Sequence, residues 1–208
     1  AILNQQARRC IVVCPLSVAK VWVREAMLHG GGLIDVLDLT EKQGTAAKAK
    51  ALAKAVPSLG HGRLAGVVVV NYQAVWRGEL GKLVLSVQGG WDMAIADESH
   101  YLKQHDSKIS RFAALLSRVS RRRVCMTGTP IGNSALDLFG QYRFLDPGVF
   151  GTSWWRFAAR YGRFDNLYAP DRVTGCRNMP ELLDRARLLW YRCGLESIKL
   201  PPLTMTSW

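Results

Sequence analysis

The sequence predicts an α/β fold, in which a parallel β-sheet is flanked by helices and followed by a C-terminal helical appendage. Short apolar, β-branched runs alternate with stretches of helical pattern from Ile11 to Met126, which is typical of βαβ units and a sheet covered on both faces. After Pro130 the pattern is mostly helical. Apolar residues make up 49% of the 208 residues, so a real core is expected and wholesale disorder is excluded.

The first predicted strand covers residues 11–14 and is stopped by Pro15. Ser17 can then cap a helix that runs to the glycines at 30–32. The next predicted elements are a strand over 34–39 and a helix over the Ala- and Lys-rich stretch 46–56. They are followed by a loop over 60–66 and a buried strand over the valines at 67–70.

The second half of the predicted sheet has strands over 93–96 and 124–126, with a helix over 107–119 between them. Helices are predicted over 135–145, 154–161 and 180–190. We expect residues 1–133 to form the sheet domain, 134–200 to form the appendage and the end of that domain, and 201–208 to be an exit linker.

The chain is strongly basic, with 28 Lys and Arg against 16 Asp and Glu and a net charge of +12. This favours a polyanionic partner, such as nucleic acid or an acidic membrane surface, although the excess charge can also serve solubility alone. No apolar run approaches the length of a membrane helix, and the start does not resemble a secretory signal. The five scattered cysteines favour a reducing compartment, so we expect an intracellular protein, with cytoplasm and nucleus not separated.

The strongest chemical feature is the run Asp97-Glu98-Ser99-His100 directly after an apolar strand. Ligands of open α/β sheets bind beyond the carboxyl ends of the strands, and paired carboxylates there suit a hydrated Mg²⁺. Asp97 would hold the metal through water, and Glu98 would orient an attacking water. The alternative is a solvated acid pair at a strand end.

Two further turns carry polar groups beside predicted strands. Thr127-Gly128-Thr129-Pro130 follows the strand at 124–126, and its alternative interpretation is an ordinary β-turn. Pro15-Leu16-Ser17 leads into a helix, whose N-terminus can seat a phosphate or be a plain cap.

Taken in the order in which they occur along the chain, the three features resemble the Swi/Snf-type family of superfamily-two helicase-like ATPases. The matching stretches are Val12 to Ser17 with Lys20, Trp22 and Glu25 (motif Ia), Val68 to Tyr72 (motif Ib), Asp97 to His100 (the DExH motif II), and Thr127 to Phe150 (motif III and its continuation). The resemblance covers residues 11–150 well and extends weakly to 202. It implies the first RecA-like lobe of an ATP-driven translocase on double-stranded DNA.

The resemblance also implies roles for individual residues. Asp97 would be the Mg²⁺ carboxylate, Glu98 would act on the catalytic water of ATP hydrolysis, and His100 would couple the nucleotide site to its surroundings. The residues that link hydrolysis to movement would be Thr127, Gly128 and Thr129. Those near a DNA strand would be Pro15, Ser17, Lys20, Asn71 and Tyr72.

Several positions depart from the family pattern. Ser99 replaces a common Ala, which we expect to be tolerated, and Gly132 replaces the usual Gln, which we expect to weaken one polar contact. Residues 191–194 lack the doubled Arg that is usual at the lobe's end.

The sequence contains no Gly-Lys-Ser/Thr, as a phosphate-binding P-loop requires. The resemblance implies that a P-loop segment precedes motif Ia, with residues 1–6 ending its helix, and that a second RecA-like lobe completes the site. We therefore expect these 208 residues alone to bind ATP poorly and not to hydrolyse it. Two alternatives stay open: a non-catalytic DNA- or protein-docking module of helicase-like fold, and a strand-separating helicase or restriction translocase subunit.

Other candidate features have plainer explanations. Seven Lys and Arg between Lys103 and Arg123 can meet DNA phosphates, but for residues 121–123 we slightly favour a solvated loop before a strand. Aromatic residues interleaved with Arg at 154–163 can stack on bases, and packing within the appendage is favoured. Cys10 and Cys14 share one face of a strand and are expected in the core rather than on a metal.

Overall fold

The computed structural model describes residues 7–59, 65–132, 134–164 and 173–191. The expectations for residues 1–6, for most of the loop at 60–66, for Asn133, for the lobe end at 192–194 and for the linker at 201–208 lie outside these ranges.

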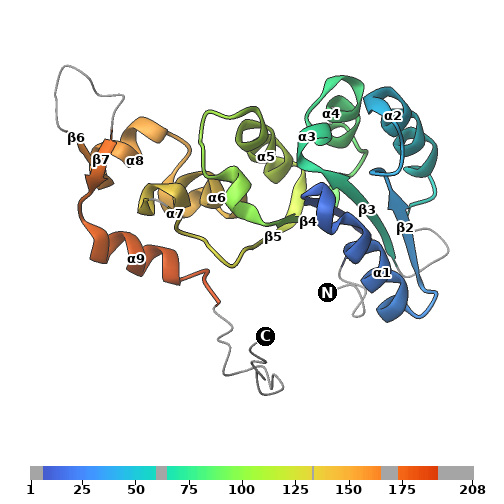
Figure 1. Cartoon of the computed structure of the whole chain (residues 1–208), viewed down its shortest axis with the longest axis horizontal. Coiled ribbons are helices and arrows are strands. Elements are labelled where there is room, and N and C mark those ends of the chain that lie inside the picture. Colours follow the sequence, from blue (N-terminus) through green and yellow to red (C-terminus); the bar gives the residue numbers. More distant parts are fainter. Residues whose placement is uncertain (1–6, 60–64, 133, 165–172, 192–208) are drawn as a thin grey trace, which may run out of the picture.

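Five parallel strands form the central sheet, which confirms the predicted α/β fold (Figure 1). Their order in space is β2-β3-β1-β4-β5, and every neighbouring pair is parallel. The strands are β1 (Arg9–Cys14), β2 (Ile34–Asp38), β3 (Ala65–Asn71), β4 (Trp91–Asp97) and β5 (Ser120–Met126). The short apolar runs of the sequence overlap these strands, because side chains that are buried on both faces of a sheet are mostly apolar. Strand β5 differs, since it begins with the buried Ser120 and the exposed Arg121 and Arg122.

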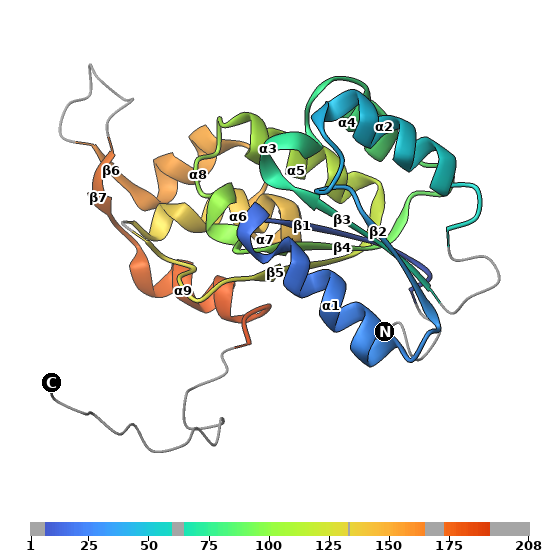
Figure 2. The ribbon, with the colours of Figure 1, turned by 45° about the vertical axis from the view of Figure 1, so that its right-hand side comes forward.

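The two faces of the sheet carry separate apolar cores, because side chains alternate along each strand. Ile11 and Val13 of β1 point into the larger core, whereas Val12 and Cys14 point into the smaller one. Helix α1 (Ala19–Gly30) covers the smaller core (Figure 2). The helices over the larger core are α2 (Gly44–Ala55), α3 (Tyr72–Val75), α4 (Gly78–Leu85) and α5 (Lys108–Arg118). Cys10 and Cys14 are buried, as predicted.

The chain after residue 134 builds an apolar cluster of its own. Its elements are the 3₁₀ turn η3 (Ala135–Asp137), α6 (Leu138–Leu145), α7 (Pro147–Phe150), α8 (Trp154–Tyr161), α9 (Met179–Arg187), and the antiparallel pair β6 (Gly162–Phe164) and β7 (Val173–Cys176). The aromatic residues Phe157 and Tyr161 of α8 are buried in this cluster, as the packing interpretation predicted, whereas Trp155 is exposed.

The structure corrects several details of the prediction. Ser17 does not cap α1: it lies in the 3₁₀ turn η1 (Leu16–Val18), and Val18 precedes the helix without any side-chain cap. Residues 72–85, for which no element was predicted, form α3 and α4. Ala65 and Gly66, expected in a loop, already belong to β3.

The three arginines at 121–123 lie in strand β5 and not in a loop. Arg123 donates hydrogen bonds to the carbonyls of Leu145 (2.7 Å), Ser117 (3.3 Å) and Ser120 (3.0 Å). Arg123 therefore holds the C-terminal ends of α5 and α6 against β5. This structural role could not be predicted from the sequence, where Arg123 is simply part of a basic run.

Within the described part of the chain, no helix is both long enough and apolar enough to cross a bilayer.

Candidate active site

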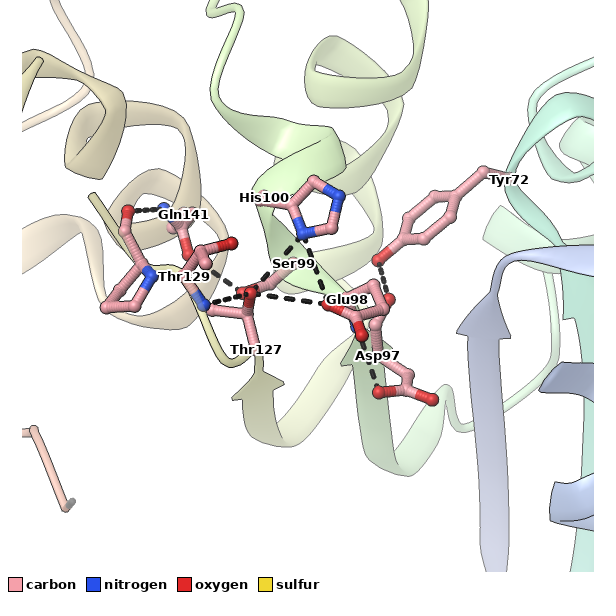
Figure 3. Close-up of polar contacts among 9 residues, drawn as sticks. Tyr72, Asp97, Glu98, Ser99, His100, Thr127, Thr129 and Gln141 are labelled. Atoms are coloured by element: carbon pink, nitrogen blue, oxygen red, sulfur yellow. Dashed lines mark hydrogen bonds and ion pairs between the residues drawn. The ribbon is translucent and has the colours of Figure 1, made fainter. Parts of the chain in front are cut away.

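The acid pair and the threonine turn lie at the same edge of the sheet. Asp97 and Met126 end the neighbouring parallel strands β4 and β5 and are paired in register. The next residues, Glu98 and Thr127, therefore leave the carboxyl edge side by side, as Figure 3 shows. The structure thus brings together two motifs that are about thirty residues apart in the chain.

Glu98 contacts two other polar side chains at this edge of the sheet. Its carboxylate Oε2 accepts a hydrogen bond from the Thr127 hydroxyl at 3.4 Å and lies 3.1 Å from Nδ1 of His100. His100 Nδ1 is in turn 3.3 Å from the Thr127 oxygen, which closes a triangle of three polar side chains (Figure 3). The side chains of Glu98 and His100 remain 41% and 36% exposed, so a ligand can reach them.

The backbone of Glu98 is left-handed, with φ 50° and ψ 51°. A residue with a Cβ rarely adopts this conformation, which costs about 1–2 kcal/mol. The turn directs the carboxylate toward Thr127 and His100, so the strain is located at the acid that the sequence singled out.

Three oxygen atoms of Asp97 accept hydrogen bonds, and Figure 3 shows the two that come from Glu98 and Tyr72. Its Oδ1 accepts from the backbone N–H of Glu98 at 2.9 Å, and its Oδ2 accepts from the indole Nε1 of Trp22 at 2.6 Å. Its carbonyl accepts from the hydroxyl of Tyr72 at 2.8 Å. Burial raises the pKa of Tyr72 well above its usual range, so this hydroxyl stays protonated and remains a donor.

The threonine turn is tightened by its own hydroxyl. Thr127 Oγ1 accepts a hydrogen bond from the backbone N–H of Thr129 at 3.1 Å. Gly128 between them is exposed, and a Cβ built there would meet no atom within 4 Å, so the glycine is not demanded by crowding. Thr129 is also exposed at the edge.

The buried side-chain amide of Gln141, which the sequence analysis did not single out, connects the turn after β4 to the turn after β5. Gln141 of α6 accepts a hydrogen bond from the Ser99 hydroxyl at 2.8 Å and donates one to the Pro130 carbonyl at 2.7 Å. Ser99 is fully buried and Gln141 is 4% exposed. The signal that could have found this contact is the polar Ser99 where the family has Ala, since a buried hydroxyl requires a partner.

The residues expected near DNA fall into two groups. Ser17 is exposed in η1, Lys20 is exposed in the first turn of α1, and Asn71 is partly exposed at the end of β3. Pro15 and Tyr72 are buried. The Tyr72 side chain fills the core and supports Asp97, so we no longer expect it to contact a DNA strand.

The donor set fits magnesium held through water. Each Asp97 oxygen accepts one hydrogen bond and keeps a lone pair for a metal-bound water. Among the described residues, no cluster of three or more His, Cys, Asp or Glu side chains could hold a metal. Mg²⁺ needs no such cluster, because it takes one or two carboxylates and keeps waters and substrate phosphates as its other ligands.

The cysteines near this edge are not nucleophiles. Burial, with smaller effects from the charges of Asp97 and Asp38, raises the pKa of Cys14 to about 12. Burial likewise raises the pKa of Cys125 to about 12. Both thiols are therefore neutral at physiological pH, and neutral thiols do not attack.

Comparison with protein families gives a match to the model described as SNF2-related domain over residues 3–199. The chain belongs to this family. This confirms the resemblance to the Swi/Snf-type ATPases that the motifs indicated.

Relatives of this SNF2-related chain include the DNA repair and recombination protein RAD54 of Oryza sativa, which is 28% identical over 204 residues, 94% of this chain and 20% of the relative. The DNA repair protein RAD5A of Arabidopsis thaliana is 32% identical over 152 residues, 70% of this chain and 13% of that protein. The chain thus spans less than a quarter of the length of these relatives.

A solved structure, the SWI2/SNF2 ATPase core of Sulfolobus solfataricus in complex with double-stranded DNA, is similar to this chain with a TM-score of 0.59. The two are 24% identical, and the match covers 76% of this chain and 29% of the neighbour. The likeness confirms the fold class of the SNF2-related chain as a RecA-like lobe.

Proposed function

We propose that this SNF2-related chain is part of the first RecA-like lobe of an ATP-driven translocase on double-stranded DNA. The observation that carries the proposal is the triangle of Glu98, His100 and Thr127, which joins the ends of two neighbouring strands at the carboxyl edge. Two lobes of this kind would close on ATP, and the second lobe and the P-loop would supply the remaining contacts to the phosphates.

The two carboxylates would have different tasks because their surroundings differ. Asp97, fixed by Trp22 and by the Glu98 N–H, is suited to hold hydrated Mg²⁺ in one orientation. When bound, Mg²⁺ would neutralise charge on the phosphates. Glu98, which is partly exposed, is suited to accept a hydrogen bond from the attacking water and to orient it toward the γ-phosphate.

Thr127 and His100 would transmit changes in the contacts of Glu98 to the rest of the lobe. Both are within 3.4 Å of the same carboxylate oxygen, so any change in what Glu98 binds alters their hydrogen bonds. Thr127 begins the turn that leads into η3 and α6, and this turn is the route by which we expect hydrolysis to be linked to movement.

The DNA partner is supported by charge and by the relatives. The net charge of +12 suits a phosphate backbone. The exposed Lys20 lies in the first turn of α1, whose N–H groups favour phosphate, and the exposed Ser17 lies in the turn η1 before it. RAD54 and RAD5A are described as DNA repair proteins.

The test is phosphate release by the protein expressed from its complete reading frame, with no DNA, with duplex DNA and with single-stranded DNA. We expect strong stimulation by duplex DNA, displacement of a third strand from a triplex, and no separation of duplex strands. Stimulation by single strands alone would indicate a strand-separating helicase. DNA binding without phosphate release would indicate the docking module instead. The 208 residues alone should release no phosphate.

A further inference from the structure

We infer that Trp22 is a positioning residue that ties the Asp97 carboxylate to helix α1, so that contact of DNA with the start of α1 is transmitted to the proposed magnesium site. This inference rests on the proposed function. It goes beyond that function, because it names one hydrogen bond as the link between the DNA-facing helix and the acid pair.

The alternation of β4 places Asp97 within reach of α1. Met93 and Ile95 pack against the core that α1 covers, and Asp97, two residues further on, extends from the same face. The indole Nε1 of Trp22 reaches Asp97 Oδ2 at 2.6 Å in a partly buried setting. Hydrogen bonds from N–H groups to carboxylates are short and stronger than neutral ones.

The position of the indole is fixed by packing. Trp22 is partly buried against the smaller core, which includes Val12, Cys14 and Ala19. Its N–H can only donate, and a carboxylate can only accept, so the bond has a single polarity. The Glu98 N–H occupies the other oxygen of Asp97 at 2.9 Å, so the plane of the carboxylate is set by these two donors together.

The same helix carries the side chains that we expect at the DNA. Lys20 is exposed in the first turn of α1 and precedes Trp22 by two residues, less than one helical turn. A helix moves as a rigid element over such a distance. A displacement of the Lys20 end therefore moves the indole and, through its N–H, one oxygen of Asp97.

The first arm of the test measures the complete protein. Trp22→Phe keeps an aromatic ring in the core and removes only the donor. Since mutation of outer-shell partners of a metal site typically costs 10–100-fold in metal affinity, we expect the Mg²⁺ concentration for half-maximal DNA-stimulated phosphate release to rise by about tenfold or more. Trp155→Phe, on the exposed side of α8, is the matched control and should not change it. An unchanged Mg²⁺ dependence in W22F would overturn the inference.

The second arm does not use activity. In the ¹⁵N-labelled 208-residue chain, the indole N–H signal that disappears in W22F belongs to Trp22. We expect Asp97→Asn to shift this signal, and addition of Mg²⁺ alone or of duplex DNA to shift it in the natural chain. Lys20→Ala should abolish the response to DNA while keeping the response to Mg²⁺.

The two arms separate failure of the inference from failure of the proposed function. If the complete protein releases no phosphate, the ATPase proposal fails and the indole signal still decides the coupling. If phosphate release is present but D97N leaves the Trp22 signal in place, the coupling is wrong and the ATPase proposal stands.

Discussion

The hydroxyl of Ser99 donates a hydrogen bond of 2.8 Å to Oε1 of Gln141, and both side chains are buried. The amide nitrogen of Gln141 donates to the Pro130 carbonyl at 2.7 Å and to the Asp137 carbonyl at 3.3 Å. One side chain thus fastens the turn after β4 to the turn after β5. The hydroxyl of Ser99 thus has a buried partner, which supports the expectation that a Ser at this position is tolerated.

We predict that Gln141→Leu destabilises the chain, because it leaves the Ser99 hydroxyl and the Pro130 carbonyl without this partner. An unsatisfied buried polar group costs about 1–3 kcal/mol, which chemical denaturation can measure. Ser99→Ala should cost less in the Q141L background than in the natural chain, since the hydroxyl it removes has already lost its partner. Equal costs in both backgrounds would mean that the two side chains are not coupled.

Glu98→Gln in the complete protein should keep ATP binding and abolish turnover, because the amide keeps the size of the side chain and loses the charge that orients water. Binding of a fluorescent nucleotide and phosphate release would be measured on the same preparation. Glu79→Gln, which alters an exposed carboxylate on α4, is the control and should leave both unchanged. Retained turnover in E98Q would remove Glu98 from the proposed role.

Lys20→Ala should weaken duplex binding at every sequence and lower the slope of log affinity against log salt by about 1, because one phosphate contact is lost. The measurement is fluorescence anisotropy across a salt series. Lys82→Ala, on the exposed side of α4 where Lys82 pairs with Glu79, is the matched control and should keep the natural slope. If the two variants give the same slope, the start of α1 does not contact the DNA.

We predict that His105 makes the stability of the chain depend on pH. Its ring stacks on Trp154 of α8 with centroids 4.0 Å apart and planes 9° apart. Burial lowers the pKa of His105 below the ordinary 6.5; nearby Asp106 opposes this effect, and Arg143 and Arg111 add to it. Because the folded chain binds this proton less readily than the unfolded chain, the stabilisation is complete above the unfolded pKa and is lost as pH falls through the folded pKa.

Denaturation at pH 8 and pH 5 would test this dependence. We expect a smaller difference in the free energy of unfolding between the two pH values for His105→Phe than for the natural chain. A natural pH dependence in H105F would assign the effect to other groups.

Features that depend on local sequence patterns could be predicted from the sequence. Strands such as β3 follow from a run of β-branched residues, and the contact of Glu98 with Thr127 follows because parallel strands end at one edge. The hairpin of β6 and β7 was not predicted, because strands of three and four residues leave too short a pattern.

Contacts between distant residues were also beyond prediction. Trp22 and Asp97 are 75 residues apart, and Ser99 and Gln141 are 42 apart. Their pairing depends on how helices α1 and α6 lie against the sheet, which the periodicity of a single chain does not determine. The exposure of Tyr72 was misjudged for the same reason: its burial arises from the helices packed over β3.

The left-handed backbone at Glu98 lowers the stability of the fold at the same residue whose carboxylate the proposed reaction requires. Glycine adopts this conformation without penalty, so Glu98→Gly should melt at a higher temperature than Glu98→Ala, although both lack the carboxylate. Glycine at this position would relieve the backbone strain, but it would also remove the carboxylate and its contacts with Thr127 and His100.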